Sequence, residues 1–487
     1  ALVTTADRHD ESQIMVYPEK PEGVTLMSYA PDEGWVERAQ VAAGSSGLSM
    51  SGNGLRLAWH EPVNVVPEEA MRGEFRGYDV AREELVRFTE GAGKARQILV
   101  HPGGDGVAYI ANFSQSRPIT IHTDLWWQTW DGSARVNLTR GGRSIDDVGW
   151  CPDGESLWVS TLDGVYRSTE IIGLDGQPRQ GIWPEALGAS SSQVAWFDGL
   201  PSFERESITD YPRIQVGPDR IAIPQPDAFD DVRCSVHRWT ASDGLAMQGV
   251  LWDLDGMAHD APLLVRAHGG PAGTVEAVRS EGVRFRHLLR AGYRLFIPAF
   301  RGSLGFGDDF LGANIGCQGV LDLDDIVTGI DHLAAQGLAD PTRVGIFGGS
   351  YGGYMTLRAL AVSDRFAAGV ALYGFLDNRW MTLQTGDFTY ETEYLAPVTW
   401  PRNKASLVSD VFSHLGDINQ PLLLLHGDSD PICPWNQSLV AFHALQARDV
   451  PTGLVVYPGE GHGFRQKQHQ HDAARRTLEW FLQHLAP

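Results

Sequence analysis

The fold of the second half of this 487-residue chain is decided by one stretch, VGIFGGSYGGYMT at residues 344–356. An apolar run (344–347) leads directly into Gly348-Gly349-Ser350-Tyr351-Gly352, and a helical run follows. In such a strand-to-helix turn, side chains two positions before and after the serine would clash, which explains the glycines there. The turn strains the serine backbone and lifts its hydroxyl above the sheet. The pattern therefore predicts that Ser350 is a nucleophile.

Strand-like and helical runs alternate on both sides of this stretch, a rhythm typical of a doubly wound, mostly parallel sheet. We expect strands at 262–267, 293–299, 344–347, 367–372, 421–425 and 453–457. We expect helices at 276–290, 320–336, 436–447 and 471–485. Residues 377–412 lack the rhythm and are expected to form an insertion. The pattern predicts an α/β-hydrolase catalytic domain at residues 236–487.

The first half has a different rhythm, in which short apolar runs alternate with Gly, Pro, Asp and Asn clusters. Copies of a turn followed by a strand begin near residues 51, 102 and 152. A second strand-like segment also recurs, and its two copies end at Thr89 and at Thr139. A repeat of roughly 50 residues is within the range of one propeller blade, since one four-stranded sheet cannot bury both faces alone. A β-sandwich with chance turn spacing is the alternative. We predict an all-β, propeller-like domain at residues 1–235, small or incomplete.

A serine hydroxyl needs a base, which is expected on a later loop, with an acid between the two in sequence. His462 lies in the glycine-rich run PGEGHG (458–463), where its ring is free to reach Ser350. The run LLLLHGDSD (422–430) ends another strand and offers the acid, for which Asp430 is the prediction and Asp428 the alternative. We expect His462 to take the serine proton and Asp430 to hold its tautomer.

The negative oxygen that forms on attack needs at least two hydrogen-bond donors. The backbone N–H of Tyr351 is one predicted donor. The run His268-Gly269-Gly270-Pro271 follows a strand and is typical of the loop that supplies the second. We predict the N–H of Gly270 there, with Gly269 as the alternative.

The net charge of −22 would repel phosphate backbones and anionic lipid heads, so we expect no nucleic-acid or membrane partner. No run approaches the roughly 20 apolar residues that cross a bilayer. The four cysteines are far apart and form no C-x-x-C pair, which disfavours a disulfide framework or a zinc site. We expect a cytoplasmic protein. The chain begins with Ala1 rather than Met, so a removed leader, and with it secretion, stays open.

Taken together, these pieces resemble the prolyl oligopeptidase family of serine peptidases, most closely its acylaminoacyl-peptidase branch. The matching motifs are His268-Gly269-Gly270-Pro271, Phe300-Arg301-Gly302-Ser303, GGSYGGYMT at 348–356, the 426–430 loop and Gly461-His462-Gly463. The resemblance implies a propeller-capped hydrolase that cleaves short peptides with no metal or organic cofactor, and it supports Asp430 over Asp428. Residues 1–235 match only through their loose repeat, and they are shorter than the propellers of this family.

We therefore expect a serine peptidase that hydrolyses short peptides or N-acylated amino-acid and peptide substrates. A small-molecule amidase or esterase on the same scaffold is the alternative, followed by a noncatalytic propeller scaffold. Around the substrate side chain we expect apolar walls from Tyr351, Phe375 and Trp380, each of which could instead be plain core. A homo-oligomer is compatible with the sequence, and we expect no metal site.

Overall fold

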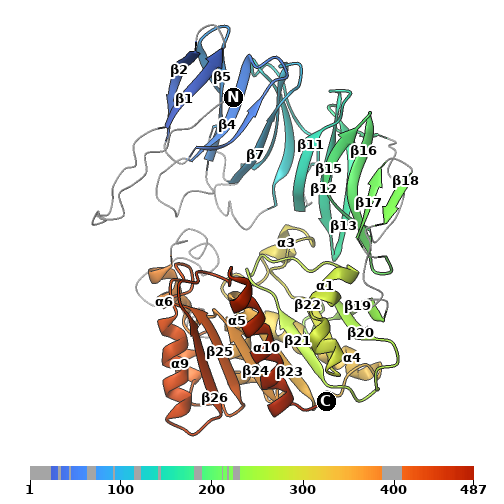
Figure 1. Cartoon of the computed structure of the whole chain (residues 1–487), viewed down its shortest axis with the longest axis vertical. Coiled ribbons are helices and arrows are strands. Elements are labelled where there is room, and N and C mark those ends of the chain that lie inside the picture. The colour runs from blue at the N-terminus through green and yellow to red at the C-terminus, as the bar shows by residue number, and fades with distance from the viewer. Residues whose placement is uncertain are drawn as a thin grey trace. The chain divides into compact units, whose positions relative to one another are not determined.

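The computed structural model of the chain describes residues 24–30, 34–42, 45–62, 73–90, 94–113, 122–140, 144–179, 189–210, 212–216, 219–222, 231–385 and 409–487. The chain divides into two compact units (Figure 1). The first unit comprises Ala1–Val159 and Glu170–Gly181, and the second comprises Ser160–Thr169 and Ile182–Pro487. The domain boundary expected between residues 235 and 236 stays a prediction.

The N-terminal part is built from antiparallel sheets that follow one another along the chain. After the pair β1 (Val24–Ala30) and β2 (Gly34–Val41) comes a sheet of β3 (Ser46–Met50), β4 (Arg56–Pro62), β5 (Gly73–Asp79) and β6 (Glu84–Arg87). The next sheet contains β7 (Lys94–Val100), β8 (Gly106–Asn112), β9 (Asp124–Thr129) and β10 (Arg135–Asn137). A third contains β11 (Ser144–Trp150), β12 (Ser156–Asp163), β13 (Tyr166–Gly173) and β14 (Pro178–Arg179). In each four-stranded sheet the strands lie side by side in chain order.

The 50-residue repeat expected from the sequence is confirmed in this part. The three turn-and-strand copies are the hairpins that lead into β4, β8 and β12. The two copies of the second recurring segment end in the same hydrogen bond. Thr89 Oγ1 accepts from the N–H of Phe75 (2.7 Å), and Thr139 Oγ1 accepts from the N–H of Leu125 (3.0 Å). Each threonine thus joins the end of its sheet to the third strand of the same sheet.

Successive sheets bury one another's faces, as propeller blades must. One cluster joins Phe75 of the β3–β6 sheet to Tyr109 of the β7–β10 sheet, with ring centroids 5.3 Å apart. A second cluster joins Ile110 of β8 to Leu157 of β12. Residues on β8 alternate between the two clusters, because successive side chains of a strand point to opposite faces. The middle sheet is therefore covered on both sides.

A fourth sheet of this kind precedes the hydrolase strands. It contains β15 (Ala189–Phe197), β16 (Leu200–Ser207), β17 (Arg213–Val216) and β18 (Asp219–Ala222), and it belongs to the second compact unit. Glu206 of β16 accepts hydrogen bonds from the backbone N–H and the hydroxyl of Ser280.

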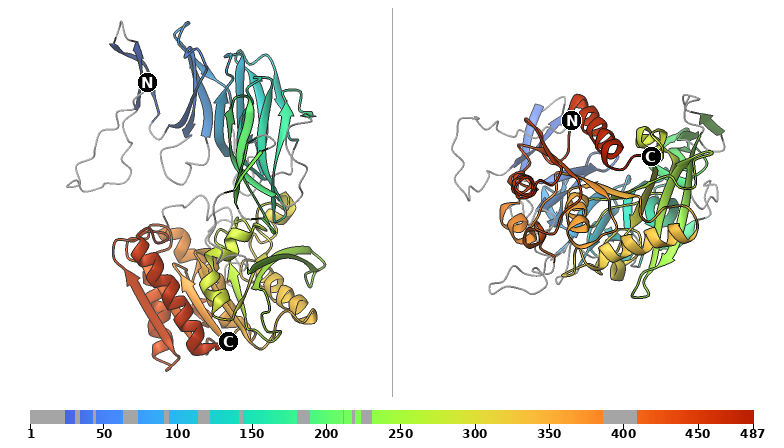
Figure 2. Two further views of the ribbon diagram at one scale, coloured as in Figure 1. Left: turned by 45° about the vertical axis from the view of Figure 1, so that its right-hand side comes forward. Right: turned by 90° about the horizontal axis from the view of Figure 1, so that it is seen from below.

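The core of the second unit is an eight-stranded sheet with the strand order β19-β20-β22-β21-β23-β24-β25-β26 (Figure 2). Its strands are β19 (Val232–Thr240), β20 (Ala246–Leu254), β21 (Leu263–Ala267), β22 (Arg294–Ala299), β23 (Val344–Gly349), β24 (Ala368–Leu372), β25 (Leu422–Gly427) and β26 (Thr452–Tyr457). The pairings from β22 through β26 are parallel, and those of β19 with β20 and β20 with β22 are antiparallel. The doubly wound, mostly parallel sheet is confirmed, whereas the antiparallel strands β19 and β20 were not expected.

Helices cover both faces of this sheet. They are α1 (Arg279–Arg284), α2 (Arg286–Arg290), α3 (Asp308–Leu311), α4 (Leu321–Ala335), α5 (Tyr351–Val362), α6 (Asn378–Gln384), α9 (Asn436–Gln446) and α10 (Lys467–His484), with a 3-10 turn at Phe412–His414. The single helix expected at 276–290 is wrong: the chain breaks at Phe285 into α1 and α2. The last helix begins at Lys467, four residues before the expected start.

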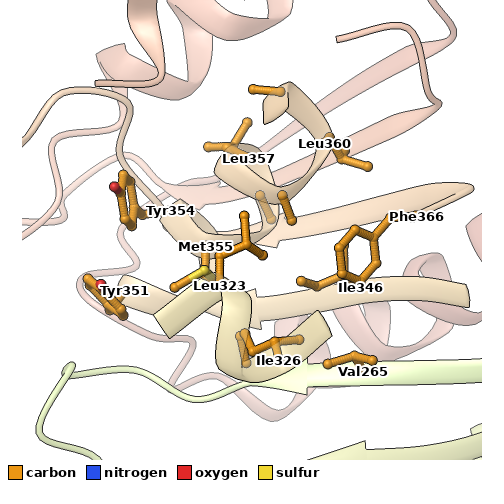
Figure 3. Packing of buried hydrophobic residues seen from close by; sticks show 14 of the residues in the cluster. Val265, Leu323, Ile326, Ile346, Tyr351, Tyr354, Met355, Leu357, Leu360 and Phe366 are labelled. Carbon is orange, nitrogen blue, oxygen red and sulfur yellow. The ribbon is translucent and has the colours of Figure 1, made fainter. Parts of the chain in front are cut away.

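Successive residues of a strand pack against helices on opposite faces of the sheet, which fixes which side chains face each helix layer. Leu263 and Val265 of β21 pack in the cluster with α4, α5 and α9, whereas Leu264 between them packs in the cluster with α2 and α10. Figure 3 shows the first cluster, in which Val265 and Ile346 face Ile326 of α4. This packing sets the carboxyl ends of β23, β25 and β26 at one edge, where the predicted site residues follow.

Candidate active site

Ser350 occupies a sharp turn between β23 and α5. Its backbone angles are φ 59° and ψ −122°, a left-handed φ that a non-glycine residue adopts only under strain. A methyl group on Gly352 would lie 2.1 Å from the carbonyl oxygen of Ala267, and one on Gly348 would lie 2.3 Å from the same atom. Both distances are far below contact distance, so the expected steric reason for these two glycines is confirmed.

The structure brings the three residues predicted as nucleophile, base and acid together. The Nε2 atom of His462 lies 2.9 Å from the Oγ atom of Ser350, and its Nδ1 atom lies 2.9 Å from the Oδ2 atom of Asp430. His462 sits on the loop between β26 and α10, and Asp430 follows β25. The alternative acid, Asp428, instead accepts from the Ser429 hydroxyl and the N–H of Gly459. Of these two carboxylates, Asp430 is thus the one bonded to His462, and its role as the acid stays a prediction.

Asp430 is held as an anion by several donors. Its Oδ1 atom accepts from the N–H groups of Ile432 (2.8 Å) and Cys433 (2.9 Å). Burial by itself would raise the pKa of Asp430, but hydrogen bonds from His426 and His462 outweigh burial and hold that pKa well below its ordinary value. A carboxylate in this position stays ionised while the imidazole beside it gains a proton.

His426 supports Asp430 from behind, and sequence reasoning did not assign it a role. Its side chain is fully buried, and its Nε2 atom lies 3.5 Å from Asp430 Oδ2 and 2.8 Å from the carbonyl oxygen of Cys433. Its Nδ1 atom lies 2.8 Å from the Ser438 hydroxyl. The available signal was the sequence HGDSD itself, where a histidine lies next to the last residue of a buried strand, four residues before the acid.

The loop that carries His462 is anchored by Glu460. The buried carboxylate of Glu460 accepts from the N–H groups of Arg465 (2.8 Å) and Gln466 (3.0 Å) and lies 2.7 Å from Nδ1 of His469. The side chain of His469 is only 18% exposed, and it ties α10 to the loop. On the other side, the Tyr373 ring packs edge-on against His462 with centroids 5.2 Å apart.

The two expected sources of oxyanion donors both border Ser350. Tyr351 is the first residue of α5, so its N–H has no acceptor within the helix. Gly269 lies against the nucleophile, since a methyl group on it would be 3.4 Å from the Cβ atom of Ser350. Gly270 follows with a φ of 125°, which glycine adopts without strain. The choice between the two glycine N–H groups stays a prediction.

His268 holds this glycine loop in place. Its ring stacks on Phe300 with centroids 4.0 Å apart, its Nδ1 atom lies 2.8 Å from the carbonyl oxygen of Gly269, and its Nε2 atom lies 2.8 Å from the Ser303 hydroxyl. Burial lowers the pKa of His268 to about 4, so its ring is neutral at physiological pH. The histidine of the HGGP run is thus a buried support rather than a second base.

The residues expected to line a substrate pocket fall into two groups. The rings of Tyr351 and Phe375 are buried in the core, and Phe375 stacks on Tyr354 with centroids 4.8 Å apart. Trp380 is 42% exposed and lies beside Phe412, which is 46% exposed, with ring centroids 5.6 Å apart. Leu383, three residues after Trp380 on α6, is also exposed. We call Trp380, Leu383 and Phe412 the α6 patch; its contact with substrate stays a prediction.

Two further features concern metals and membranes. Within the described ranges, no group of three or more His, Cys, Asp and Glu side chains is placed to hold a metal ion. In the same part of the chain, no helix has the length and apolarity needed to span a bilayer.

Comparison with known proteins places this site in a family context. Residues 282–487 match the family described as the prolyl oligopeptidase family. The chain is 29% identical over 268 residues to the uncharacterized peptidase YuxL of Bacillus subtilis, which covers 51% of this chain and 38% of that protein. It is 29% identical over 232 residues to the acylamino-acid-releasing enzyme of Arabidopsis thaliana, covering 45% of this chain and 30% of that protein. The matches thus span well under half the length of these relatives.

Solved structures resemble the chain over nearly its whole length. The Pyrococcus horikoshii acylaminoacyl peptidase superposes with a TM-score of 0.83 at 18% identity, covering 98% of this chain and 79% of that chain. A puromycin hydrolase superposes with a TM-score of 0.76 at 20% identity, covering 95% and 74%. The likeness confirms the fold class, an all-β, propeller-like domain followed by an α/β-hydrolase domain.

Proposed function

We propose, because residues 282–487 belong to the prolyl oligopeptidase family, that this chain is a serine peptidase of short peptides and N-acylated amino-acid or peptide substrates. The observation that carries the proposal is the continuous hydrogen-bonded path from Ser350 through His462 to Asp430, with 2.9 Å at each step. A path of this geometry turns a weakly nucleophilic hydroxyl into one whose proton has an acceptor at the moment of attack.

In the proposed reaction, Nε2 of His462 accepts the Ser350 proton as Oγ bonds to the scissile carbonyl carbon. The resulting imidazolium is stabilised by the Asp430 carboxylate at Nδ1. The carbonyl oxygen, now negative, accepts from the N–H of Tyr351 and from one glycine N–H of the 269–270 pair. His462 then protonates the departing amine, which leaves an ester on Ser350. A water molecule, deprotonated by His462, hydrolyses the ester and regenerates the hydroxyl.

The substrate class rests on two lines of support. A relative named acylamino-acid-releasing enzyme matches 45% of the chain, and the acylaminoacyl peptidase of Pyrococcus horikoshii shares the fold. The α6 patch exposes large apolar surface from Trp380 and Leu383, and we propose that this surface receives an apolar side chain on the acyl side of the scissile bond. We therefore propose that N-acylated substrates with an apolar residue before the scissile bond are preferred.

A fluorophosphonate probe followed by a substrate panel tests this proposal. The intact chain should be labelled, and S350A and H462A should not. Among chromogenic substrates, N-acetylated apolar amino-acid anilides should be turned over, and W380A should raise their KM more than that of the acetyl-glycine anilide. Turnover of simple esters with none of any peptide or amino-acid anilide would instead identify a small-molecule esterase, and an unlabelled folded protein would exclude a serine hydrolase altogether.

A further inference from the structure

The side chain of Tyr351 points away from the reaction and into the core. Its ring is 2% exposed and lies beside the rings of Phe300 and Tyr354, with centroids 6.1 Å and 5.3 Å away. Figure 3 shows Tyr351 and Tyr354 side by side at the start of α5. The backbone N–H of Tyr351 is a proposed oxyanion donor, so whatever fixes this side chain also fixes the direction of that donor.

The far end of Tyr351 is fixed by one carboxylate. Its hydroxyl donates to the Oδ2 atom of Asp322, which lies in the first turn of α4 and is fully buried. The Oδ1 atom of Asp322 accepts from the N–H of Leu323 at 3.0 Å. The first turn of α5 is thereby tied to the first turn of α4 by a side-chain bond inside the core.

In the described part of the chain, Asp322 is buried without an ion-pair partner, unlike the carboxylates around it. The nearby guanidinium of Arg301 is bound by Asp325 (Nε to Oδ2, 2.8 Å) and by Asp243 (Nη1 to Oδ2, 2.7 Å). Among the described residues, no salt bridge reaches Asp322. Burial and the charge of Asp325 raise the pKa of Asp322, and the Tyr351 hydroxyl and two backbone N–H groups lower it, so that it lies at about 7. Burying a carboxyl with no cation beside it costs folding free energy, so its presence here is poorly explained by stability alone.

We propose that Asp322 is a positioning residue of the peptidase, which acts through the Tyr351 hydroxyl to aim the Tyr351 N–H at the oxyanion. The inference rests on the proposed function and deepens it. The packing of its ring and the hydrogen bond of its hydroxyl both restrain the Tyr351 side chain. Because the side chain is held, the Tyr351 N–H keeps its direction when negative charge develops on the substrate. Such preorganisation stabilises the transition state and leaves ground-state binding unchanged.

The test compares Tyr351→Phe with Tyr354→Phe on the same helix. Both tyrosines are buried and both hydroxyls are hydrogen-bonded, that of Tyr354 to the carbonyl oxygens of Gln318 and Ser409. The N–H of Tyr354 is already bonded to the carbonyl oxygen of Ser350, so it cannot serve the oxyanion. Both variants should be destabilised, but only Y351F should lose kcat, by roughly tenfold, less than the roughly hundredfold cost of deleting an oxyanion donor.

A second pair of variants follows the carboxylate. D322A should lower kcat as Y351F does, whereas D322N should stay near wild type, since its amide keeps a hydrogen bond to the hydroxyl. The double variant Y351F/D322A should be no slower than either single variant. A peptide aldehyde, whose adduct places an oxygen in the oxyanion position, should bind Y351F and D322A weaker by the same factor as kcat falls, with KM within twofold of wild type.

Equal kcat for Y351F and Y354F, with both merely less stable to unfolding, would overturn the inference and leave Asp322 a structural residue. If D322A does not fold, the comparison of Y351F with Y354F decides alone. Failure of the proposed function looks different, because the wild-type chain would then resist the fluorophosphonate probe and show no anilide turnover to compare.

Discussion

Replacing Asp430 by asparagine should abolish most of the activity without disturbing the fold. The contacts of Asp430 determine which way the asparagine amide must point. Two backbone N–H groups, of Ile432 and Cys433, point at Oδ1 from 2.8 and 2.9 Å. An amide that turned its NH2 group toward them would set donors against donors. The asparagine oxygen must therefore stay at the Oδ1 position, and its NH2 group must take the place of Oδ2, 2.9 Å from Nδ1 of His462.

The magnitude follows from the tautomer that this orientation selects. An NH2 group at Nδ1 makes that nitrogen an acceptor, so the neutral imidazole carries its proton on Nε2, facing Ser350. In that form His462 cannot take the serine proton. The same exchange in a Ser-His-Asp triad costs about 10⁴ in kcat through the wrong tautomer, which corresponds to about 5 kcal/mol of barrier. We expect D430N to lower kcat by roughly 10³ to 10⁴, with KM nearly unchanged.

The assay is steady-state hydrolysis of an N-acetylated apolar anilide, with thermal unfolding as the check on folding. Asp428→Asn is the matched control, two residues away on the same loop, because Asp428 bonds Ser429 and Gly459 and not His462. D428N should stay within a few-fold of wild type. The reasoning is refuted if D430N, folded, keeps more than a tenth of wild-type kcat, or if D428N is the more damaged of the two.

Three further predictions concern the supports of the site. Gly352→Ala should unfold well below wild type in a thermal melt, because its methyl group would meet the Ala267 oxygen at 2.1 Å, whereas Gly416→Ala, with no atom within 4 Å, should be tolerated; equal melting of the two would contradict the steric argument. Burial raises the pKa of Glu206 from 4.5 to about 7, so the folded state holds this proton more tightly than the unfolded chain and stability falls as pH rises from about 4.5 to 7, by at most about 3 kcal/mol. Glu206→Gln should reduce the difference in the free energy of unfolding between pH 5 and pH 7.5, measured by denaturant titration. An unchanged difference would show that another group takes up the proton. Glu460→Ala should slow fluorophosphonate labelling of Ser350 roughly tenfold by loosening the His462 loop, while Arg475→Ala, on the exposed side of α10, should label at the wild-type rate.

Much of the hydrolase half was predictable because its rules are local. The elbow around Ser350 requires glycine at fixed positions, and the parallel strands that flank it are buried on both faces and so read as continuous apolar runs. The order of nucleophile, acid and base along the chain then limits the choice of partners to loops after later strands. The residues by themselves left Asp428 and Asp430 open as the acid, since both follow the same strand, and only the three-dimensional structure shows which of the two is bonded to His462.

The features that the sequence concealed depend on contacts between distant segments. The strands β19 and β20 pair antiparallel with each other, and β20 pairs antiparallel with β22 across some 50 residues, which no local pattern announces. The break between α1 and α2 falls at Phe285, whose ring packs against Phe347 and under the guanidinium of Arg266, so tertiary contacts override a continuous helical period. His469 lies on α10, and its partner Glu460 lies on the loop before that helix, so no periodicity within the helix indicates the contact.

The five residues that begin with Ser350 show why the elbow is more diagnostic than the acid or the base. Gly352 is held against the β21 backbone, and a methyl group on Gly353 would meet the carbonyl oxygen of Leu372 on β24 at 2.7 Å. Tyr351 and Tyr354 fill the core on the side of α4, which leaves Ser350 as the one side chain of the five that turns toward the imidazole. Each position of the motif is therefore constrained by a contact with a different part of the structure. An acid or a base, in contrast, needs only a flexible side chain on a loop that reaches the right place, so its position can drift along the sequence while the elbow cannot.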